Sequence, residues 1–316
     1  MSRFRMLNTL IEAARRTKAM IVTSTGTASL GLALLGGTAV AIPETAEAAR
    51  CTQNANGWSC THTKRYNYYW CGGYYIPRAV RWQVPEGTPP AGGWPVAFYF
   101  AGTQPSDYNH AFDRDYGETF GLEYEPQIIR ELLDAPNGGT KYAVIVADPP
   151  ATSGSWQYWH TNVVNPYSAS CDAQFFPDFF GEIKSGSYGA ASQYDMNKRY
   201  AYGISSGGFN SSRMAVTYNS GTGNANTWKA LGIVAASYAT CSYSCGTIPT
   251  LPTNHPPTKF WHGQNDGIVP ISTMYAYFNK LVQGGFTTQK LENPNGHQLT
   301  VDNLGVSGIK AWFDQY

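Results

Sequence analysis

A serine between two glycines is the part of the sequence that most directly indicates chemistry. Gly203, Ser205 and Gly207 give the pattern Gly-x-Ser-x-Gly between an expected strand and an expected helix. In such a strand-to-helix turn the glycines remove side chains that would collide, and the serine is strained with its hydroxyl exposed. Ser206 also carries a hydroxyl, but Ile204 stands two residues before it, so the glycine frame selects Ser205 as the nucleophile.

An acid and a base able to activate this serine follow it in the chain. A serine hydroxyl is a weak nucleophile near neutral pH and needs a neighbouring base, which a carboxylate orients. Asp266 lies in a Gly- and Asn-rich loop, and His297 lies in a later loop before the last expected helix. The order serine, acid, histidine is typical of enzymes with this turn. An Asx-turn is the alternative role for Asp266, and His262, at a strand end, is expected to be structural.

Backbone donors for a tetrahedral oxyanion are expected beside the serine and after an earlier strand. One is the N–H of Ser206. The loop at 100–104 supplies the other, with the N–H of Thr103 preferred and that of Gln104 second. Three residues are also candidates for contacting the substrate. Trp156 and Trp159 lie in an aromatic stretch that follows a strand expected to end beside the site, and Gln104 lies in the expected oxyanion loop.

Alternating strands and helices must position these residues. Short apolar or alternating runs predict strands, and longer amphipathic runs predict helices. We expect strands over 78–84, 96–100, 142–147, 200–204, 231–236 and 259–262, and helices over 172–184, 209–218, 272–284 and 304–313. Pro177 predicts a start or a kink inside the first of these helices. The alternation indicates an α/β fold with a mostly parallel central sheet and helices on both faces, and a ligand site at the carboxyl ends of the strands.

The first 48 residues have the composition of a cleaved export signal. A basic stretch over 3–18 precedes an apolar run, and Ala46 and Ala48 place small residues where a signal peptidase reads. A transmembrane anchor is the alternative, but polar residues at 23–27 interrupt the apolar run. We therefore expect a secreted, extracellular protein. The arginine pair at 15–16 is compatible with twin-arginine export, and the general secretory route stays open.

Cysteine usage supports an oxidising compartment. All six cysteines lie beyond residue 48, and this even number predicts three disulfides among Cys51, Cys60, Cys71, Cys171, Cys241 and Cys245. Proximity favours Cys241 with Cys245, and Cys51 with Cys60 or Cys71. A zinc site is the rival interpretation, but Cys-x3-Cys occurs once and no His-x3-5-His follows it. We expect a signal peptide over 1–48, a Cys- and aromatic-rich segment over 49–77 and one catalytic domain over 78–316.

Composition excludes two classes of protein. Charged and aromatic residues each make up 14% of the 316 residues, which is inconsistent with a mainly disordered chain. The first 48 residues carry five basic and three acidic side chains, so without them the net charge of +1 becomes about −1. No basic stripe remains for a nucleic acid. The aromatic stretch at 66–75 is a candidate contact surface for a hydrophobic ligand, and a half-buried hairpin pinned by Cys71 is the alternative.

Taken together, the motifs resemble those of secreted polyhydroxyalkanoate depolymerases and their esterase relatives. The resemblance covers most of residues 78–316 and rests on Gly-Ile-Ser-Ser-Gly-Gly at 203–208, Gly-Thr-Gln at 102–104 and His-Gly-x-x-Asp-x-x-Val-Pro at 262–270. The Ile-Ser-Ser-Gly form is most similar to the medium-chain-length group, such as extracellular poly(3-hydroxyoctanoate) depolymerases, which lack a separate polymer-binding domain. The chain departs from the pattern at Ala101, where these relatives often have histidine before the oxyanion glycine.

The resemblance implies an α/β-hydrolase fold and a serine esterase with Ser205 as nucleophile, Asp266 as acid and His297 as base. No metal and no organic cofactor are needed. The implied partner is a hydrophobic polyester, with no nucleic acid and no stable membrane anchor, while acyl chain length and oligomeric state stay open. The alternatives are a feruloyl or acetyl-xylan-type carbohydrate esterase, a short-chain polyhydroxybutyrate depolymerase without a binding domain, and a non-catalytic secreted binding protein.

Overall fold

The computed structural model describes residues 49–105, 111–150, 156–164, 166–219, 228–239, 248 and 250–316. All of these residues belong to one unit of the chain. The expected signal peptide at 1–48 and the expected pair Cys241 and Cys245 lie outside the described residues. Among the described residues, no helix is long and apolar enough to span a bilayer.

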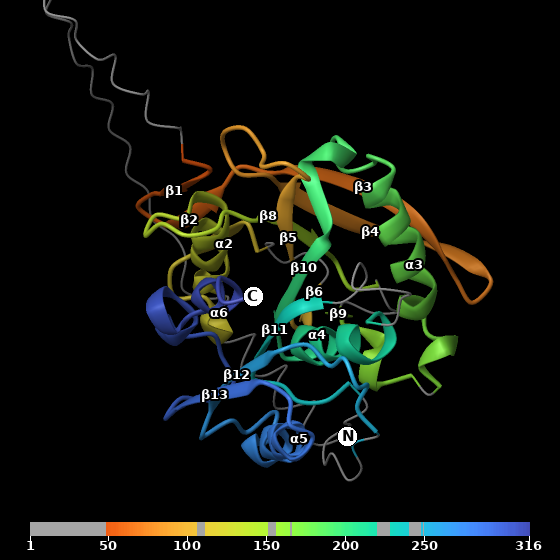
Figure 1. Ribbon diagram of the computed structural model, residues 1–316, viewed down its shortest axis with the longest axis vertical. Coiled ribbons are helices and arrows are strands. Elements are labelled where there is room, and N and C mark those ends of the chain that lie inside the picture. The colour runs from red at the N-terminus through yellow and green to blue at the C-terminus, as the bar shows by residue number, and fades with distance from the viewer. Residues whose placement is uncertain are drawn as a thin grey trace, which may run out of the picture. The chain divides into compact units, whose positions relative to one another are not determined.

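An 8-stranded sheet forms the centre of this unit, in the order β13-β12-β11-β10-β5-β8-β4-β3 (Figure 1). Its strands are β3 (Thr63–Cys71), β4 (Tyr74–Gln83), β5 (Trp94–Phe100), β8 (Ala143–Ala147), β10 (Tyr194–Ile204), β11 (Trp228–Val234), β12 (Thr258–Gly263) and β13 (Thr288–Asn293). Neighbours from β13 to β8 are parallel, whereas β4 is antiparallel to both β8 and β3. The expected α/β fold, with its mostly parallel central sheet, is confirmed.

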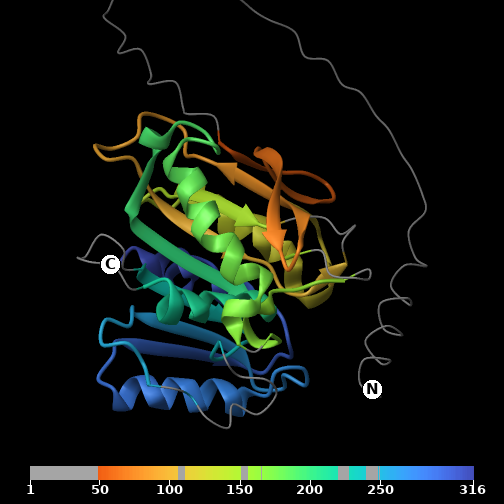
Figure 2. The same cartoon turned by 90° about the vertical axis from the view of Figure 1, so that its right-hand side faces the viewer.

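Helices cover both faces of the sheet, as the views in Figures 1 and 2 show for α2 and α6 against α3 and α4. They are α2 (Glu125–Asp134), α3 (Cys171–Lys184), α4 (Ser206–Thr217), α5 (Ile271–Gln283) and α6 (Ile309–Phe313). Helices α2 and α6 share a core with the sheet face of Val144 and Val234. On the opposite face, α3 and α4 pack on Phe98 and Leu231, and α5 packs on Ile233. Three apolar clusters among the described residues, one on the first face and two on the other, thus hold the sheet between helical layers.

Smaller elements complete the described chain. Strands β1 (Cys51–Gln53), β2 (Gly57–Cys60) and β7 (Asp113–Asp115) form a 3-stranded sheet, and β6 (Gln104–Pro105) pairs with β9 (Trp156–Gln157). Short 3-10 helices occupy Thr119–Tyr124, His160–Asn162, Tyr167–Ala169, Ala191–Gln193, Val301–Asn303 and Gly305–Ser307.

Each expected strand and helix overlaps an observed one, but three details differ. Helix α3 continues through Pro177, because aromatic side chains on both sides of the proline pack into the same core and offset the lost hydrogen bond. Helix α6 begins at Ile309, so the expected start at residue 304 was too early. Helix α2 and strand β13 were not expected. Strand β13 lies at a half-exposed sheet edge, and its sequence, TQKLEN, has no apolar pattern that would predict a strand.

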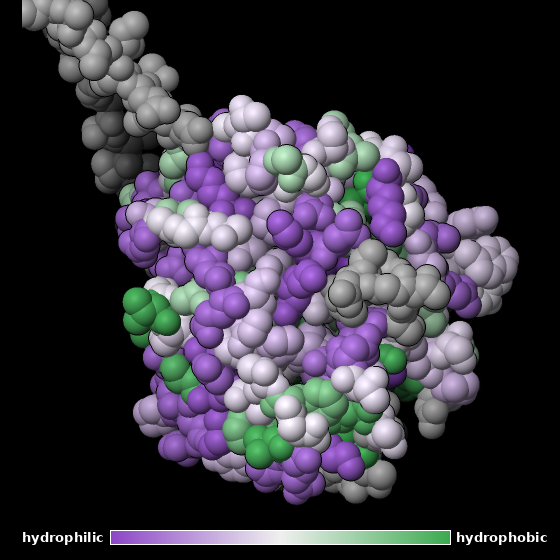
Figure 3. All heavy atoms as spheres, viewed as in Figure 1, coloured by the Kyte–Doolittle hydropathy of each residue, from purple (hydrophilic) through white to green (hydrophobic). Residues whose placement is uncertain are grey.

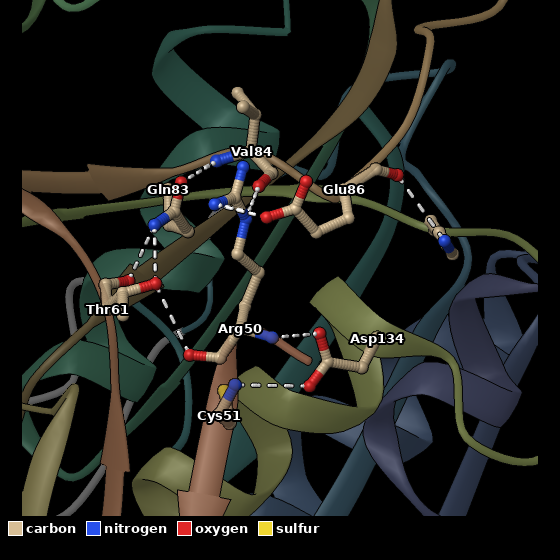
Figure 4. A network of polar contacts seen from close by, with 8 residues as sticks. Arg50, Cys51, Thr61, Gln83, Val84, Glu86 and Asp134 are labelled. Atoms are coloured by element: carbon tan, nitrogen blue, oxygen red, sulfur yellow. Dashed lines mark hydrogen bonds and ion pairs between the residues drawn. The ribbon is translucent and has the colours of Figure 1, made fainter. Parts of the chain in front are cut away.

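Within the segment 49–77, residues from 63 on form β3 and the start of β4 in the central sheet, whereas β1 and β2 belong to the 3-stranded sheet. The boundary between residues 77 and 78 falls inside β4. Figure 4 shows how the start of the segment is fixed to the body: the backbone N–H groups of Arg50 and Cys51 donate to the two carboxylate oxygens of Asp134, at 2.9 and 3.2 Å. The Arg50 guanidinium also pairs with Glu86 at 2.6 Å. The Asp134 contacts attach the start of β1 to α2, and the ion pair attaches it to the loop after β4.

Two disulfides are present among the described cysteines. Cys51 bonds to Cys60, one of the two expected alternatives. Cys71 bonds to Cys171, which was not expected from proximity because 100 residues separate the two in sequence. This second bond ties the tip of the β3–β4 hairpin to the first residue of α3.

Candidate active site

The backbone of Ser205 is strained in the way that the glycine frame predicts. Its φ of 55° and ψ of −124° are unusual for a residue with a side chain. A Cβ on Gly203 would lie 2.5 Å from the carbonyl oxygens of Phe100 and Gly207, and one on Gly207 would lie 1.8 Å from that of Phe100. Glycine is therefore required on both sides so that α4 can start directly above β5 and β10.

The loop after β5 lies directly against this serine. A Cβ on Gly102 would be 3.4 Å from the Cβ of Ser205, in ordinary van der Waals contact. Thr103, the next residue, is exposed. Ser206 is the first residue of α4, where backbone N–H groups have no partner within the helix. The residue before Thr103 thus lies against the residue before Ser206, and the two oxyanion donors stay a prediction.

The expected acid and base are hydrogen-bonded to each other. His297 Nδ1 lies 2.8 Å from Asp266 Oδ2, and the Asp266 side chain has no exposed surface. The other oxygen, Oδ1, accepts from the N–H groups of Ile268 and Val269 at 2.9 and 2.8 Å. Asp266 therefore makes the expected Asx-type turn and also contacts the histidine, so the two interpretations are not exclusive. The acid follows β12 and the histidine follows β13, at the carboxyl edge of the sheet that also bears Ser205.

A second imidazole contacts the same carboxylate. His262 Nε2 lies 2.9 Å from the carbonyl oxygen of Val269 and 3.3 Å from Asp266 Oδ2. Burial alone would raise the pKa of the Asp266 carboxyl, but the hydrogen bonds from His262 and His297 and the Val269 N–H together hold it well below its usual value. The carboxylate is therefore ionised throughout the neutral range. His262 is more than a strand-end residue, and its position four residues before Asp266 was the available signal.

The acid loop and the histidine loop are joined along their backbones. The N–H groups of Gln264 and Asn265 donate to the carbonyls of Asn293 and Asn295, at 2.7 and 3.0 Å. A Cβ on Gly263 would lie 2.3 Å from the carbonyl oxygens of Asn295 and Gly296. The glycine after His262 is thus needed for the two loops to approach this closely.

The sequence as a whole was compared with known proteins. No family model matches it. It is 35% identical to the poly(3-hydroxyoctanoate) depolymerase of Pseudomonas fluorescens over 246 residues, which cover 76% of this chain and 80% of that protein. The chain belongs to the poly(3-hydroxyoctanoate) depolymerase family.

Among solved structures, a Bacillus cereus carboxylesterase is similar at 16% identity and a TM-score of 0.47, covering 75% of this chain and 93% of its own. An esterase of Thermogutta terrifontis is similar at 14% identity and a TM-score of 0.46, covering 80% of this chain and 91% of its own.

Phe120 is a residue beside the candidate base that sequence reasoning missed. Its φ of 64° is a left-handed conformation that bulky residues rarely adopt. Its ring stands edge-on to the imidazole of His297, with centroids 5.9 Å apart. The carbonyl of Phe120 also accepts from the N–H of Leu299 at 2.9 Å. The only sequence signal was Gly121, which marks a turn; a Cβ there would lie 2.1 Å from the carbonyl oxygen of Leu299.

The three residues expected to contact the substrate of a depolymerase occupy different environments. Trp159 has no exposed surface, so the expectation that its side chain meets substrate was wrong. Its indole Nε1 donates to the carbonyl of Ala101 at 3.0 Å instead. Trp156 is half-buried in β9, and Gln104 is largely buried in β6, the strand that pairs with it. Both stay candidates on the segment that follows the oxyanion loop.

A separate hollow of about 380 Å³ lies far from these residues. Trp94, Pro95 and Lys141 line it, at the starts of β5 and β8. The parallel strands begin at this edge of the sheet, whereas the candidate active site is at the opposite edge. The hollow is therefore not the place where Ser205 would act.

Proposed function

We propose that this protein is an extracellular serine esterase that hydrolyses the ester bonds of polyhydroxyalkanoates with medium-chain 3-hydroxyacyl units. The observation that carries the proposal is the His297–Asp266 hydrogen bond of 2.8 Å at the carboxyl edge of the sheet, the same edge at which the strained Ser205 follows β10. The family relationship to a poly(3-hydroxyoctanoate) depolymerase supplies the substrate class.

Acylation is the first half of the proposed reaction. The Oγ of Ser205 attacks the ester carbonyl carbon while Nε2 of His297 takes the hydroxyl proton. Asp266 keeps Nδ1 protonated and stabilises the imidazolium. The N–H groups of Ser206 and Thr103 donate to the oxyanion of the tetrahedral intermediate. When this intermediate collapses, His297 returns the proton to the leaving alkoxide, and the hydroxyl end of the polymer departs.

Deacylation repeats these steps with water. His297 removes a proton from water, the hydroxide oxygen attacks the acyl carbon, and Ser205 leaves with the proton from the imidazolium. The product is the free carboxylic acid end of the polymer or a 3-hydroxy acid. Proton transfer and charge stabilisation are both supplied by side chains and backbone groups of this chain.

A polyester particle does not fit inside a pocket, so an enzyme acting on it must hold it at the surface. The β3–β4 hairpin offers such a surface: Tyr66, Tyr68, Trp70 and Tyr75 are between 48% and 68% exposed. They stand with Pro77 on the hairpin face turned away from the buried Tyr69, which packs against Phe175 of α3. No residue from 66 to 77 is charged. An uncharged aromatic face suits an uncharged polymer, since removing apolar surface from water stabilises the contact by roughly 25 cal/mol per Å2.

The direction of the strands places this hairpin on the same side of the sheet as Ser205. Strand β4 is antiparallel to β8, and Val80 pairs with Ala147, the last residue of β8. Residues 71–79 therefore extend beyond the carboxyl ends of the parallel strands. In Figure 3 the end of the hairpin is the pale protrusion at the right, between darker hydrophilic regions. A polymer held there lies on the edge of the sheet from which the nucleophile projects.

Secretion is part of the proposal. Residues 1–48 are proposed to be a signal peptide that is removed, and the disulfides Cys51–Cys60 and Cys71–Cys171 fit an oxidising destination. Amino-terminal sequencing of the protein from culture medium tests this directly. A mature chain that begins at Ala49 is the expected result, and retention of an uncleaved chain in the cell would contradict it.

Substrate choice is tested by two assays on one preparation. The protein is given a poly(3-hydroxyoctanoate) latex and, separately, methyl ferulate. Clearing of the latex with little release of ferulate is the expected result. Rapid ferulate release without clearing would support the carbohydrate esterase alternative instead, and clearing confined to polyhydroxybutyrate would move the acyl preference to short chains.

A further inference from the structure

Trp159 touches both sides of the proposed oxyanion site although it belongs to neither. Its backbone N–H donates to the Oγ of Ser206 at 2.9 Å. Its indole Nε1 donates to the carbonyl of Ala101 at 3.0 Å. Ser206 begins α4, and Ala101 begins the loop after β5 that continues through Gly102 to Thr103. One residue therefore joins the two backbone segments whose N–H groups must point at the same oxygen.

We propose that Trp159 is a positioning residue, which sets the distance and orientation between the oxyanion donors on Ser206 and Thr103. The proposal rests on the function proposed above. The buried indole N–H needs an acceptor, and it finds the Ala101 carbonyl rather than water. Holding this carbonyl fixes the peptide plane that leads into Gly102, which itself lies against Ser205. Donors held in advance stabilise developing charge without a reorganisation cost during the reaction.

The tryptophan is itself held by a rigid environment. Its ring stacks on Phe176 with centroids 5.7 Å apart and meets Phe100 edge-on at 5.1 Å. The N–H of the next residue, His160, donates to Asp172 Oδ2 at 2.5 Å. The other oxygen of Asp172 accepts from Arg78 at 2.7 Å, and neither side chain of this ion pair has exposed surface. Helix α3 and strand β4 therefore fix the backbone at the tryptophan.

Helix α4 fixes the same segment from the other side. Arg213 Nε donates to the hydroxyl of Thr161 at 2.9 Å, and its Nη2 donates to the carbonyls of Thr161 and Ala239, at 2.6 and 2.9 Å. Residues 159–161 are thus bonded to three elements of the fold at once. Such density of buried polar bonds is what a support for a catalytic geometry requires.

The variant Trp159→Phe tests the proposal, because phenylalanine keeps an aromatic ring in the core but lacks the indole donor. The measurements are kcat and KM for p-nitrophenyl octanoate, and the inhibition constant of an octyl trifluoromethyl ketone, whose adduct with serine carries an oxyanion. We expect kcat to fall about tenfold, KM to stay within about twofold, and inhibition to weaken by the factor lost from kcat/KM.

Trp228→Phe is the matched control. Trp228 is also buried, and its Nε1 donates to the carbonyl of Tyr218 at 3.2 Å, but it stands at the amino end of β11, away from Ser205. This variant loses the same kind of bond and should lose similar stability in urea while keeping the wild-type kcat. An unchanged kcat in Trp159→Phe, a loss confined to KM, or an equal loss of kcat in the control would overturn the proposal.

A second variant covers the case in which Trp159→Phe does not fold. Ser206→Ala keeps the backbone donor but removes the hydroxyl that accepts from the Trp159 N–H, and it should lower kcat several-fold with KM unchanged. Wild-type kcat in this variant would contradict the proposal. Failure of the underlying function has a different signature: the wild-type protein would then not react with a fluorophosphonate at Ser205, whatever the tryptophan variants do.

Discussion

His262 Nε2 lies 3.3 Å from Asp266 Oδ2, the same oxygen that is hydrogen-bonded to Nδ1 of the proposed catalytic His297. The carboxylate is thus held by two imidazoles as well as two backbone N–H groups. Removing the His262 donor leaves the carboxylate less fixed and less able to orient His297. We predict that His262→Phe lowers kcat for p-nitrophenyl octanoate about tenfold with little change in KM, since a hydrogen bond to a charged group contributes about 1.5–3 kcal/mol.

His262→Gln is the comparison for this prediction, because its amide N–H2 is able to donate in place of Nε2. It should retain more of the wild-type kcat than the phenylalanine variant does. Equal losses in both would mean that imidazole packing, and not the donor, is what matters at this position.

Alanine substitutions at Gly263, the last residue of β12, and at Gly267 in the acid loop are predicted to have opposite outcomes. A Cβ on Gly263 would press on the carbonyl oxygens of Asn295 and Gly296, whereas one on Gly267 would meet nothing within 4 Å. Gly263→Ala must push the histidine loop away from the acid loop. We predict at least a 100-fold loss of kcat/KM in Gly263→Ala, consistent with the cost of misplacing a catalytic group by about 1 Å. Gly267→Ala should stay within about twofold of the wild type.

Stability is predicted to fall on mild acidification because of one buried histidine. Burial lowers the pKa of His255 from 6.5 to about 4, and its Nε2 lies 2.6 Å from the hydroxyl of Tyr277. The unfolded chain takes up a proton below pH 6.5 while the folded chain does not until pH 4. Stability from this group is therefore complete above pH 6.5 and declines as the pH falls to 4, by about 3 kcal/mol in total.

Urea unfolding at pH 7.5 and pH 5 measures this effect. The free energy of unfolding should drop more between these two pH values in the wild type than in His255→Gln, which cannot take up the proton. Equal drops in the two proteins would show that His255 does not carry the predicted dependence.

The exposed aromatic side chains of the hairpin are predicted to affect hydrolysis of the polymer but not of a small soluble ester. In the double variant Tyr68→Ser and Trp70→Ser, the ratio of latex clearing to p-nitrophenyl octanoate hydrolysis should fall about tenfold, because apolar contact area with the particle is lost. Val306→Ser is the control, since Val306 is fully exposed but lies in the short helix Gly305–Ser307, outside the hairpin. Co-sedimentation with the latex reports adsorption directly. An unchanged ratio in the double variant would remove the hairpin from the account.

The residues that sequence predicted best are those whose type is dictated by local geometry. Gly203, Gly207 and Ser205 mark a strained turn, and the alternation of strands and helices around it has a clear apolar pattern. The pair Cys71 and Cys171 was beyond such reasoning, because which cysteines meet depends on how β3 and α3 pack. Strand β13 was missed because its edge position needs no apolar residues.

Trp159 shows the same limit for the site. Its sequence neighbourhood, an aromatic run after a strand, is equally compatible with a ligand surface and with a buried support. Only the packing of the ring against Phe100 and Phe176 distinguishes the two. Phe120 was missed for a related reason, since it reaches His297 through a left-handed turn that sequence marks only by Gly121.

The most direct test of the account is the site at which a fluorophosphonate reacts. The wild-type protein is treated with the reagent, digested, and analysed by mass spectrometry beside Ser205→Ala, which should keep its fold but lose hydrolysis of p-nitrophenyl octanoate. The account predicts one adduct, on the peptide that contains Ser205, and no adduct in the variant. Labelling of another residue, or appreciable turnover by Ser205→Ala, would contradict it.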